Sequence, residues 1–279
     1  LGPRLINYHG IICSVNSVVQ CLYGTRELPG LMRELEFDAA DTPNAVPVAL
    51  KNLFRDMSAE SAESAWPCDP SRLVDSMSVY RGTSFWVQED AEAVFGCIVN
   101  ALADGCGPDR DIGKLWRVEK EDSVRCLSCN AVLSSGRSKS NTILVSLENR
   151  ALPRELQEYV LRRGGSDYNV CECYCDTCRA RTRVVITSHV LSLPPVVCVK
   201  IARIRLTAAD RLAKIEKGFA FPETLDLKPL VKEIDDAGAG AGPLYHYELY
   251  AGLHVKTTYG SDGSDLSRPV AYMLMYQRK

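Results

Sequence analysis

The apolar residues in roughly the first hundred positions recur at the spacing of an α-helix. Within residues 13–23 they fall on one helical face: Val15, Val18, Val19 and Leu22. Gly24 follows as a C-cap. Segments 46–57 and 87–103 repeat the pattern, and a stretch containing Pro and Ser, 58–72, separates them. We therefore predict that this part of the chain is mostly helical.

From about residue 115 the pattern changes to short runs that are typical of β-strands. Strands are predicted at 195–206, 245–255 and 269–277. A helix is predicted at 153–163, and loops are predicted at 134–140, 164–167 and 235–243. The second part of the chain therefore differs in kind from the helical first part.

The predicted strand 245–255 has two faces of different character. His246, Glu248 and His254 share one face, because successive side chains of a strand point to opposite sides. The other face carries Tyr245, Tyr247, Leu249, Ala251 and Leu253. A solvated strand face is the simplest interpretation of the two histidines and the glutamate.

Composition limits the classes of function. With 279 residues and 46% hydrophobic residues, the chain can bury one large core or two smaller ones. A formal net charge of −2 and a pI near 6.2 provide no excess of basic residues for nucleic acid or for an anionic membrane. No apolar run reaches the roughly 18 residues of a membrane span. We expect no nucleic-acid partner, no membrane association and a monomer.

Half of the twelve cysteines crowd into residues 126–178. Two Cys-x-x-Cys pairs in that segment supply four thiols: Cys126, Cys129, Cys175 and Cys178. Four thiolates suit a tetrahedral, structural Zn²⁺ with no open coordination position. Free thiols are the alternative, and Cys171 and Cys173 are spare ligands or bystanders. Metal binding fits a reducing compartment, so we expect the cytoplasm or also the nucleus.

Cys13 is the candidate nucleophile. A nucleophilic cysteine needs a thiolate, and the unpaired N–H groups and dipole at the start of a helix stabilise negative charge. Cys13 has this placement if the predicted helix begins there. The same N–H groups can form part of an oxyanion hole. An inert, buried helical cysteine is the alternative interpretation.

The sequence around Cys13 resembles the cysteine box of the ubiquitin-specific proteases, Gly-Leu-x-Asn-x-Gly-x-x-Cys-x-x-Asn-Ser-x-x-Gln. The residues that keep their mutual spacing are Gly10, Cys13, Asn16, Ser17 and Gln20. The resemblance implies that Cys13 is the nucleophile and that Asn7 donates to the oxyanion. Arg4 replaces the leading Gly of the pattern, and one residue is inserted between Asn7 and Gly10. For Asn7, a plain turn residue is an equally good interpretation.

The resemblance continues along the chain in the family's order. Residues 88–92 are similar to its Gln-Gln-Asp-Ala-x-Glu segment, which implies substrate contacts by Gln88 and Asp90. Further similar segments are 193–203, 221–227, 247–249 and 271–276. The compact size and the run Cys173 to Cys178 look most like the interferon-induced member, which acts on a two-lobed ubiquitin-like modifier.

The resemblance implies an α+β, papain-like cysteine protease fold. We expect a helical thumb at 1–112, zinc-bearing fingers at 113–190 and a mainly β-sheet palm at 191–279. The zinc would close the tip of the finger-like sheet that grips the modifier. The implied activity is a thiol-dependent isopeptidase, with ubiquitin or a ubiquitin-like modifier and its protein conjugates as partners. The spacing of apolar residues is compatible with this fold but does not by itself identify it.

The catalytic base of the family is missing from its usual place. The family has a Gly-His-Tyr segment and then an Asn-Asp pair, but here Val255 is followed at once by residues that resemble the approach to the closing strand. Four histidines are available, and His254 is the candidate substitute base. The alternative is a catalytically inactive module that binds the modifier. A zinc-ribbon nucleic-acid binder is a weaker alternative because of the acidic balance.

Overall fold

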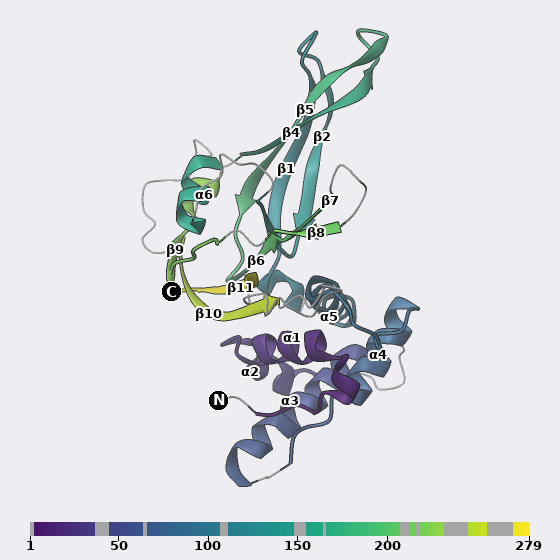
Figure 1. Cartoon of the computed structure of the whole chain (residues 1–279), viewed down its shortest axis with the longest axis vertical. Helices are drawn as coiled ribbons and strands as arrows, with labels where there is room; N and C mark the ends of the chain where they lie inside the picture. The colour runs from purple at the N-terminus through teal and green to yellow at the C-terminus, as the bar shows by residue number, and fades with distance from the viewer. Residues whose placement is uncertain are drawn as a thin grey trace, which may run out of the picture. The chain divides into compact units, whose positions relative to one another are not determined.

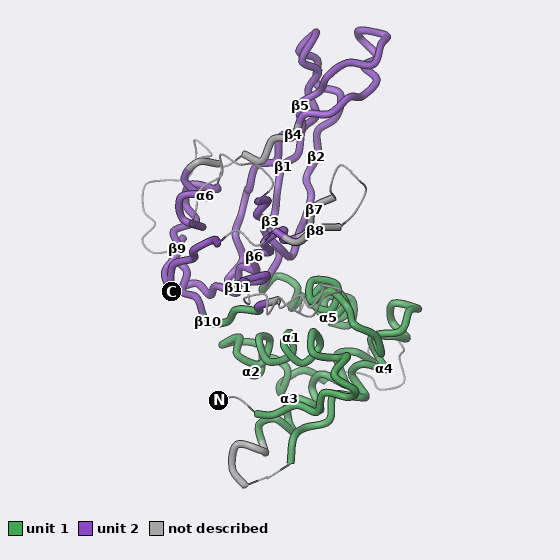
Figure 2. Tube along the Cα trace, in the orientation of Figure 1, with its two compact units in different colours: residues 1–115, 250–253 green, residues 116–249, 254–279 purple. Residues whose placement is uncertain are grey.

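The computed structural model describes ten segments of the chain. They are residues 3–36, 45–63, 66–106, 111–147, 155–163, 166–206, 212–215, 218–231, 245–255 and 270–279. The chain forms two compact units, shown in different colours in Figure 2. Unit 1 contains residues 1–115 and 250–253, and unit 2 contains 116–249 and 254–279. The division into thumb, fingers and palm stays a prediction.

Unit 1 is built from helices (Figure 1). Its α-helices are α1 (Cys13–Tyr23), α2 (Leu28–Glu34), α3 (Ala45–Glu63), α4 (Ser71–Arg81) and α5 (Ala91–Gly105). Two short 3₁₀ helices, η1 (Tyr8–Gly10) and η4 (Ile112–Leu115), precede α1 and follow α5. The helix predicted from Cys13 to Tyr23 is confirmed, with Gly24 as its C-cap. The helices predicted at 46–57 and 87–103 correspond to α3 and α5.

The separating stretch 58–72 is shorter than predicted. Helix α3 continues to Glu63 and α4 already begins at Ser71. Serine does not end α3 at residue 57, because the Ser58 hydroxyl donates to the Phe54 carbonyl one turn earlier, at 2.8 Å, and the helix continues. Helix α4 buries Leu73, Val74 and Met77.

Apolar faces of the helices form the core of unit 1. Helix α1 packs against α5, and α3 packs against both α4 and α5. The apolar face of α1 is fully buried, and it comprises Val15, Val18, Val19 and Leu22. A buried face of this kind stabilises a short helix that propensity alone would leave marginal.

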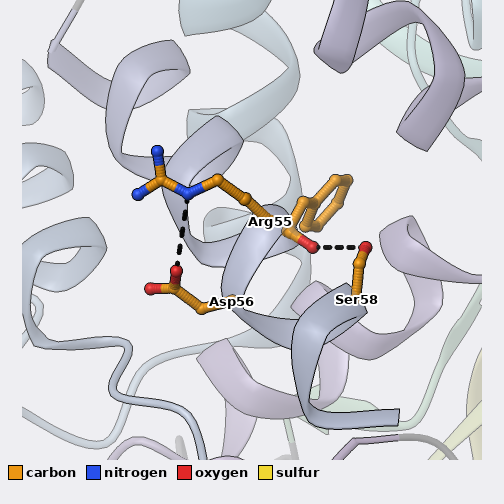
Figure 3. Close-up of polar contacts among 4 residues, drawn as sticks. Arg55, Asp56 and Ser58 are labelled. Carbon is orange, nitrogen blue, oxygen red and sulfur yellow. Dashed lines mark hydrogen bonds and ion pairs between the residues drawn. The ribbon is translucent and has the colours of Figure 1, made fainter. Parts of the chain in front are cut away.

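Helix α3 also carries polar contacts, drawn in Figure 3. The Ser58 hydroxyl donates to the Phe54 carbonyl at 2.8 Å. Arg55 Nε lies 3.7 Å from Asp56 Oδ1, and both side chains are exposed. An exposed pair of this kind contributes little to stability. The buried side of α3, and not its surface charge, holds the helix in place.

Unit 2 contains a four-stranded antiparallel sheet in the order β2-β1-β5-β4. Its strands are β1 (Val118–Cys126), β2 (Val132–Ser140), β4 (Ser166–Cys175) and β5 (Ala180–Ser192). The loop predicted at 134–140 is therefore wrong, because those residues belong to β2. The end of the loop predicted at 164–167 belongs to β4.

The polar composition of β2 is that of an edge strand. Cross-strand register places Lys139 opposite Glu119 and Arg137 opposite Glu121. Oppositely charged cross-strand pairs stabilise antiparallel pairing, and exposed charge on an edge strand opposes unwanted association. A strand of this type has no apolar alternation to reveal it.

A second sheet of five strands follows the order β3-β6-β11-β10-β9. Its strands are β3 (Ile143–Ser146), β6 (Val196–Ala202), β9 (Thr224–Asp226), β10 (His246–Val255) and β11 (Val270–Arg278). The predicted strands at 245–255 and 269–277 are confirmed as β10 and β11. The predicted strand at 195–206 is divided into β6 and β7 (Ile204–Leu206), which pairs with β8 (Leu212–Lys214).

The break between β6 and β7 falls at Arg203. This side chain is buried, and its Nε donates to the carbonyl of Ala271 at 2.9 Å. Burial lowers the pKa of Arg203 from its ordinary value. The predicted helix at 153–163 is observed as α6 (Leu156–Arg163), and η5 (Lys228–Leu230) packs against it. The loop predicted at 235–243 lies outside the described residues.

One hydrophobic cluster fills the interior of unit 2. Its fully buried members include Val145, Val197, Ile201, Tyr247, Leu274 and Tyr276. Strand β11 is buried without interruption from Ala271 to Gln277, so side chains on both of its faces are removed from water. This burial of apolar surface at β6 and β11 stabilises the centre of the sheet. None of the described helices is long and apolar enough to cross a membrane.

Candidate active site and cysteine cluster

Helix α1 begins at Cys13, and the Cys13 side chain is exposed. Ile12 occupies the N-cap position and provides no side-chain cap. The first turn of α1 also contains no acidic residue. Backbone N–H groups in a first helical turn have no intrahelical acceptor, so they are available to an anion. The start of α1 can therefore favour a negatively charged sulfur and an oxyanion beside it.

Asn7 is exposed and lies immediately before η1. The Gly10 N–H donates to the Asn7 carbonyl at 3.3 Å, so the backbone of Asn7 closes this turn. His9 and Gly10 both have left-handed backbone conformations, with φ of 51° and 72°. The additional residue of the cysteine box thus lies in a left-handed turn, which Gly accepts without strain. Both interpretations of Asn7 stay open, because its backbone serves the turn and its side chain is exposed.

Polar residues of the cysteine box hold the preceding segment beside α1. Asn16 Nδ2 donates to the Ile6 carbonyl at 3.0 Å, and Gln20 Nε2 donates to the Pro3 carbonyl at 3.2 Å. Backbone bonds continue the attachment, from Ile6 N–H to the Cys68 carbonyl and from Cys68 N–H to the Arg4 carbonyl. The spacing of Asn16 and Gln20 to Cys13 therefore has a structural reason. One face of α1 carries the candidate nucleophile Cys13 and the two side chains, Asn16 and Gln20, that hold the preceding segment in place.

Tyr8 was not predicted as a site residue. Its ring meets Trp86 edge to face, with 5.6 Å between ring centroids. A side-chain hydrogen bond to Asp69 raises the pKa of Tyr8. Partial burial opposes ionisation of Asp69, but hydrogen bonds from Ser71 and Tyr8 outweigh it and lower the pKa of that carboxyl. The turn before Cys13 is thus attached to two other segments of unit 1.

The predicted substrate contacts lie just before α5. Asp90 is the N-cap of α5, and its Oδ1 accepts the Glu92 N–H at 2.7 Å. This bond gives Asp90 a local structural role, since a capping carboxylate satisfies a first-turn N–H group. Gln88 is exposed two residues earlier. Contacts of Gln88 and Asp90 with a substrate stay predictions.

His254 lies in β10 and is exposed. Burial along β10 alternates as predicted, with His246, Glu248 and His254 on the exposed side. The His254 ring lies 6.4 Å from the ring of Phe221, measured between centroids. His254 belongs to unit 2 and Cys13 to unit 1, and the role of His254 as a base stays a prediction.

The four predicted metal ligands come together in unit 2. The Sγ atoms of Cys126, Cys129, Cys175 and Cys178 all lie within 4.8 Å of one another. Cys126 Sγ is 3.9 Å from Cys178 Sγ, and Cys129 Sγ is 3.6 Å from Cys175 Sγ. A tetrahedral ion with Zn–S bonds of about 2.3 Å requires sulfur separations of about 3.8 Å. The donor set therefore fits Zn²⁺, and all twelve cysteines, which lie in the described residues, are without disulfides.

The two Cys-x-x-Cys turns share a backbone feature. Each is followed by a residue with positive φ, Asn130 at 62° and Arg179 at 52°. Such residues reverse the chain tightly, so that both cysteines of a turn point to one place. Thr182 Oγ1 lies 3.2 Å from Cys126 Sγ. This contact, together with backbone N–H groups, lowers the pKa of Cys126 to about 6. The hydrogen bond with Cys129 and burial raise the pKa of Cys178 to about 12, so the crowded thiols favour a first thiolate at Cys126 and oppose a further one at Cys178.

An exposed cysteine at the start of a helix, on an α+β chain, is the arrangement of a thiol hydrolase. Residues 4–264 match the ubiquitin carboxyl-terminal hydrolase (UCH) family. The chain therefore belongs to the ubiquitin carboxyl-terminal hydrolase family. This membership, with helices in unit 1 and the sheets in unit 2, confirms the predicted α+β, papain-like fold.

Individual relatives are similar at low identity. The chain is 22% identical over 260 residues to ubiquitin carboxyl-terminal hydrolase 47 of Drosophila melanogaster, which covers 85% of this chain and 16% of that protein. It is 24% identical over 259 residues to ubiquitin carboxyl-terminal hydrolase 15 of Saccharomyces cerevisiae, covering 88% and 20%. It is 24% identical over 269 residues to ubiquitin carboxyl-terminal hydrolase 17-like protein D of Mus musculus, covering 88% and 44%. The chain thus spans less than half the length of these three relatives.

Proposed function

We propose that the chain is a thiol-dependent isopeptidase that removes ubiquitin or a ubiquitin-like modifier from conjugated proteins. The observation that carries the proposal is Cys13, exposed at the first residue of an uncapped helix in a chain of the UCH family. The names of the relatives support ubiquitin as the first modifier to test.

The proposed reaction uses the thiolate of Cys13. Its sulfur attacks the carbonyl carbon at the C-terminal Gly-Gly of the modifier, and the amine leaves after it gains a proton. Water then hydrolyses the thioester, which releases the modifier and restores the thiol. First-turn N–H groups of α1 and the side-chain amide of Asn7 stabilise the oxyanion. Gln88 and Asp90 contact the modifier.

The base in this proposal is His254, which accepts the thiol proton and returns it to the leaving amine. Exposure of His254 on β10 supports this role. The second candidate function is modifier binding without hydrolysis. It is favoured by the sequence, in which none of the four histidines stands in a Gly-His-Tyr segment.

Labelling tests the nucleophile. Ubiquitin carrying a C-terminal electrophile should form a covalent adduct with the full chain, and Cys13→Ala should abolish the adduct. Cys171→Ser removes another exposed cysteine and is the matched control, which should still label. A folded chain that forms no adduct with ubiquitin or with the two-lobed modifier, or an adduct that survives Cys13→Ala, contradicts the proposal.

Hydrolysis distinguishes the two candidate functions. Release of a fluorophore from the C-terminus of the modifier, lost in both Cys13→Ala and His254→Ala, supports the isopeptidase. Binding of the modifier with no hydrolysis supports the second candidate. Retention of full hydrolysis in His254→Ala excludes His254 as the base.

The modifier is proposed to be the two-lobed one. The cysteine run Cys173 to Cys178 supports this choice. Parallel labelling with single-lobed ubiquitin and with a two-lobed ubiquitin-like modifier, each bearing the same electrophile, compares them directly. Faster labelling by ubiquitin contradicts the two-lobed choice and leaves the role of Cys13 intact.

The cysteine cluster is proposed to hold a structural Zn²⁺. The fit of the sulfur separations to a tetrahedral ion supports it. The ion would join the ends of β1 and β4 to the turns that follow them, where the sheet has little apolar core of its own. A nucleophilic thiol and four thiol ligands stay reduced in the cytoplasm or nucleus, which is where we place the protein.

A further inference from the structure

Two exposed thiols stand on β4 beside the cysteine cluster. Cys171 and Cys173 are exposed, whereas Cys175, two residues further along the same strand, is a buried member of the cluster. Side chains at alternate positions of a strand point to the same face, so all three thiols share one face of β4. Successive members are separated by about 6.6 Å along the strand, from a rise of about 3.3 Å per residue.

Cross-strand register brings Cys173 close to a second side of the cluster. In the pairing of β4 with β5, Cys173 lies opposite Thr182 and Cys175 lies opposite Ala180. Directly opposed residues of an antiparallel pair place their side chains on the same face. Thr182 Oγ1 is 3.2 Å from Cys126 Sγ. Cys173 is therefore two residues from the ligand Cys175 on its own strand. Across the sheet it lies opposite Thr182, which contacts the ligand Cys126.

The surroundings of the three thiols suit a cation. Their partners on β5 are uncharged: Val184 opposite Cys171, Thr182 opposite Cys173 and Ala180 opposite Cys175. The arginines of this part of β5 pair with the intervening residues of β4, Arg183 with Glu172 and Arg181 with Tyr174. These arginines therefore lie on the opposite face of the sheet. The strand β4 is also an edge strand, and the exposure of Cys171 and Cys173 shows that their thiols can be reached from solvent.

We propose that Cys171 and Cys173 form an exposed thiol ladder, through which Zn²⁺ enters and leaves the four-cysteine cluster. A metal site of four ligands needs an entry path; Cys126 and Cys175 are buried, Cys178 is half-buried, and Cys129 is exposed, and the ladder leads to the buried Cys175 along its own strand. The ion binds first to the exposed pair, which releases two thiol protons. It would then pass to the cluster as the four ligand thiols release their protons and replace Cys173 and Cys171, which take two protons back, so that four protons are released in all. No oxidation or reduction takes part.

Isotope exchange on the zinc-loaded full chain tests the ladder. Labelled zinc bound to the protein is chased with natural zinc, and both the retained label and the total zinc per chain are measured by mass spectrometry. In the double variant Cys171→Ser with Cys173→Ser, exchange should slow on the order of ten-fold, a size taken from the lower end of the effects that outer-shell groups have on metal sites. Total zinc should stay at one ion per chain. Cys13→Ser, which removes an exposed thiol from unit 1, should exchange like the parent.

Three results overturn the proposal. Exchange in the double variant at the rate of the parent shows that the two thiols are bystanders. A double variant that loses the bound zinc shows that they are structural ligands. A parent chain that binds no zinc removes the cluster assignment itself. All these readouts are independent of Cys13 chemistry, so failure of the isopeptidase proposal leaves the test intact.

Discussion

The ring of Tyr8 meets the ring of Trp86 edge to face, at 5.6 Å between centroids and 73° between planes. Tyr8 lies in the turn between Asn7 and the start of α1, and Trp86 lies two residues before Gln88. Trp86 is fixed in turn, because its Nε1 donates to Asp75 Oδ1 at 2.7 Å. The contact therefore joins the segment before the candidate nucleophile to the segment that carries the predicted substrate contacts.

Removal of the Tyr8 ring should loosen the turn that precedes Cys13. We expect Tyr8→Leu to lower the free energy of unfolding by about 1 kcal/mol, the scale of one aromatic pair. It should also slow labelling of Cys13 by a modifier carrying a C-terminal electrophile. Tyr8→Phe keeps the ring contact and loses only the hydrogen bond to Asp69. Its free energy of unfolding and its labelling rate should therefore lie between those of Tyr8→Leu and the parent.

A matched control lies at the other end of α1. Tyr23 and Phe54 also meet edge to face, at 5.2 Å between centroids. Tyr23→Leu should therefore cost a similar free energy of unfolding and leave the labelling rate of Cys13 unchanged. Equal labelling rates for Tyr8→Leu and the parent would show that the Tyr8 contact serves stability alone.

Asn16→Asp should destabilise the protein at neutral pH. The change replaces the N–H group that donates to the Ile6 carbonyl with a carboxylate oxygen, and two acceptors then face each other. The loss should be about 1–3 kcal/mol, and the favourable position of an acid near a helix start offsets only part of it. Protonation restores a donor, so the variant should regain stability as the pH falls toward the ordinary pKa of aspartate.

Thermal unfolding at neutral and acidic pH measures this effect. Gln20→Glu is the control, because its side chain donates to the Pro3 carbonyl at an exposed position where water can replace the bond. A variant Asn16→Asp that is less stable at acidic than at neutral pH, relative to the parent, would contradict the assigned hydrogen bond.

Alkaline pH should destabilise unit 1 through its buried thiols. Burial raises the pKa of Cys21 to about 12 and that of Cys97 to about 11, from a reference value of 9.0. The folded state therefore keeps protons that the unfolded state has lost. The stabilising contribution is complete below pH 9 and declines as the pH rises toward the folded-state pKa values.

The slope of the free energy of unfolding against pH shows how many buried thiols contribute. Between about pH 9 and 11, each buried thiol should contribute a decline of about 1.4 kcal/mol per pH unit in the free energy of unfolding. Cys21→Ala should remove the share of one thiol, as measured by urea unfolding across this range. Val19→Ala, a buried change on the same helix, should lower stability and keep the slope of the parent. An unchanged slope in Cys21→Ala would show that this thiol already ionises in the folded state.

The sequence predicted those features that have a local signal. Regular apolar spacing identified α1 and α5, and alternation identified β10. The clustering of the four cysteines was predicted because two Cys-x-x-Cys pairs are typical of a structural metal site. Strand β2 was missed, because its serines and charged residues are stabilised by pairing with β1, a contact that no local pattern encodes. Tyr8 was missed for the same reason, since its partners Trp86 and Asp69 are distant in sequence.

Removal of metal should affect the cysteine turns and leave unit 1 unchanged. The Leu127 N–H donates to the Arg183 carbonyl at 2.9 Å, and the Asn130 N–H donates to the Cys126 carbonyl at 3.0 Å. Without an ion, four thiols are left to hold two tight turns that have little core around them, and these amides should exchange with solvent faster.

Hydrogen exchange with and without a strong chelator measures this local opening. The Val94 amide of α5, which donates to the Asp90 carbonyl at 3.1 Å, is the internal control in unit 1 and should keep its protection. Cys126→Ser should reproduce the effect of the chelator and lose the bound zinc, whereas Cys13→Ser should retain it. Retention of one zinc per chain by Cys126→Ser would mean either that the assigned ligand set is wrong or that the neighbouring Cys173 replaces the lost thiolate. The combined variant Cys126→Ser with Cys173→Ser separates these two cases, since only recruitment of Cys173 predicts that the second change removes the ion.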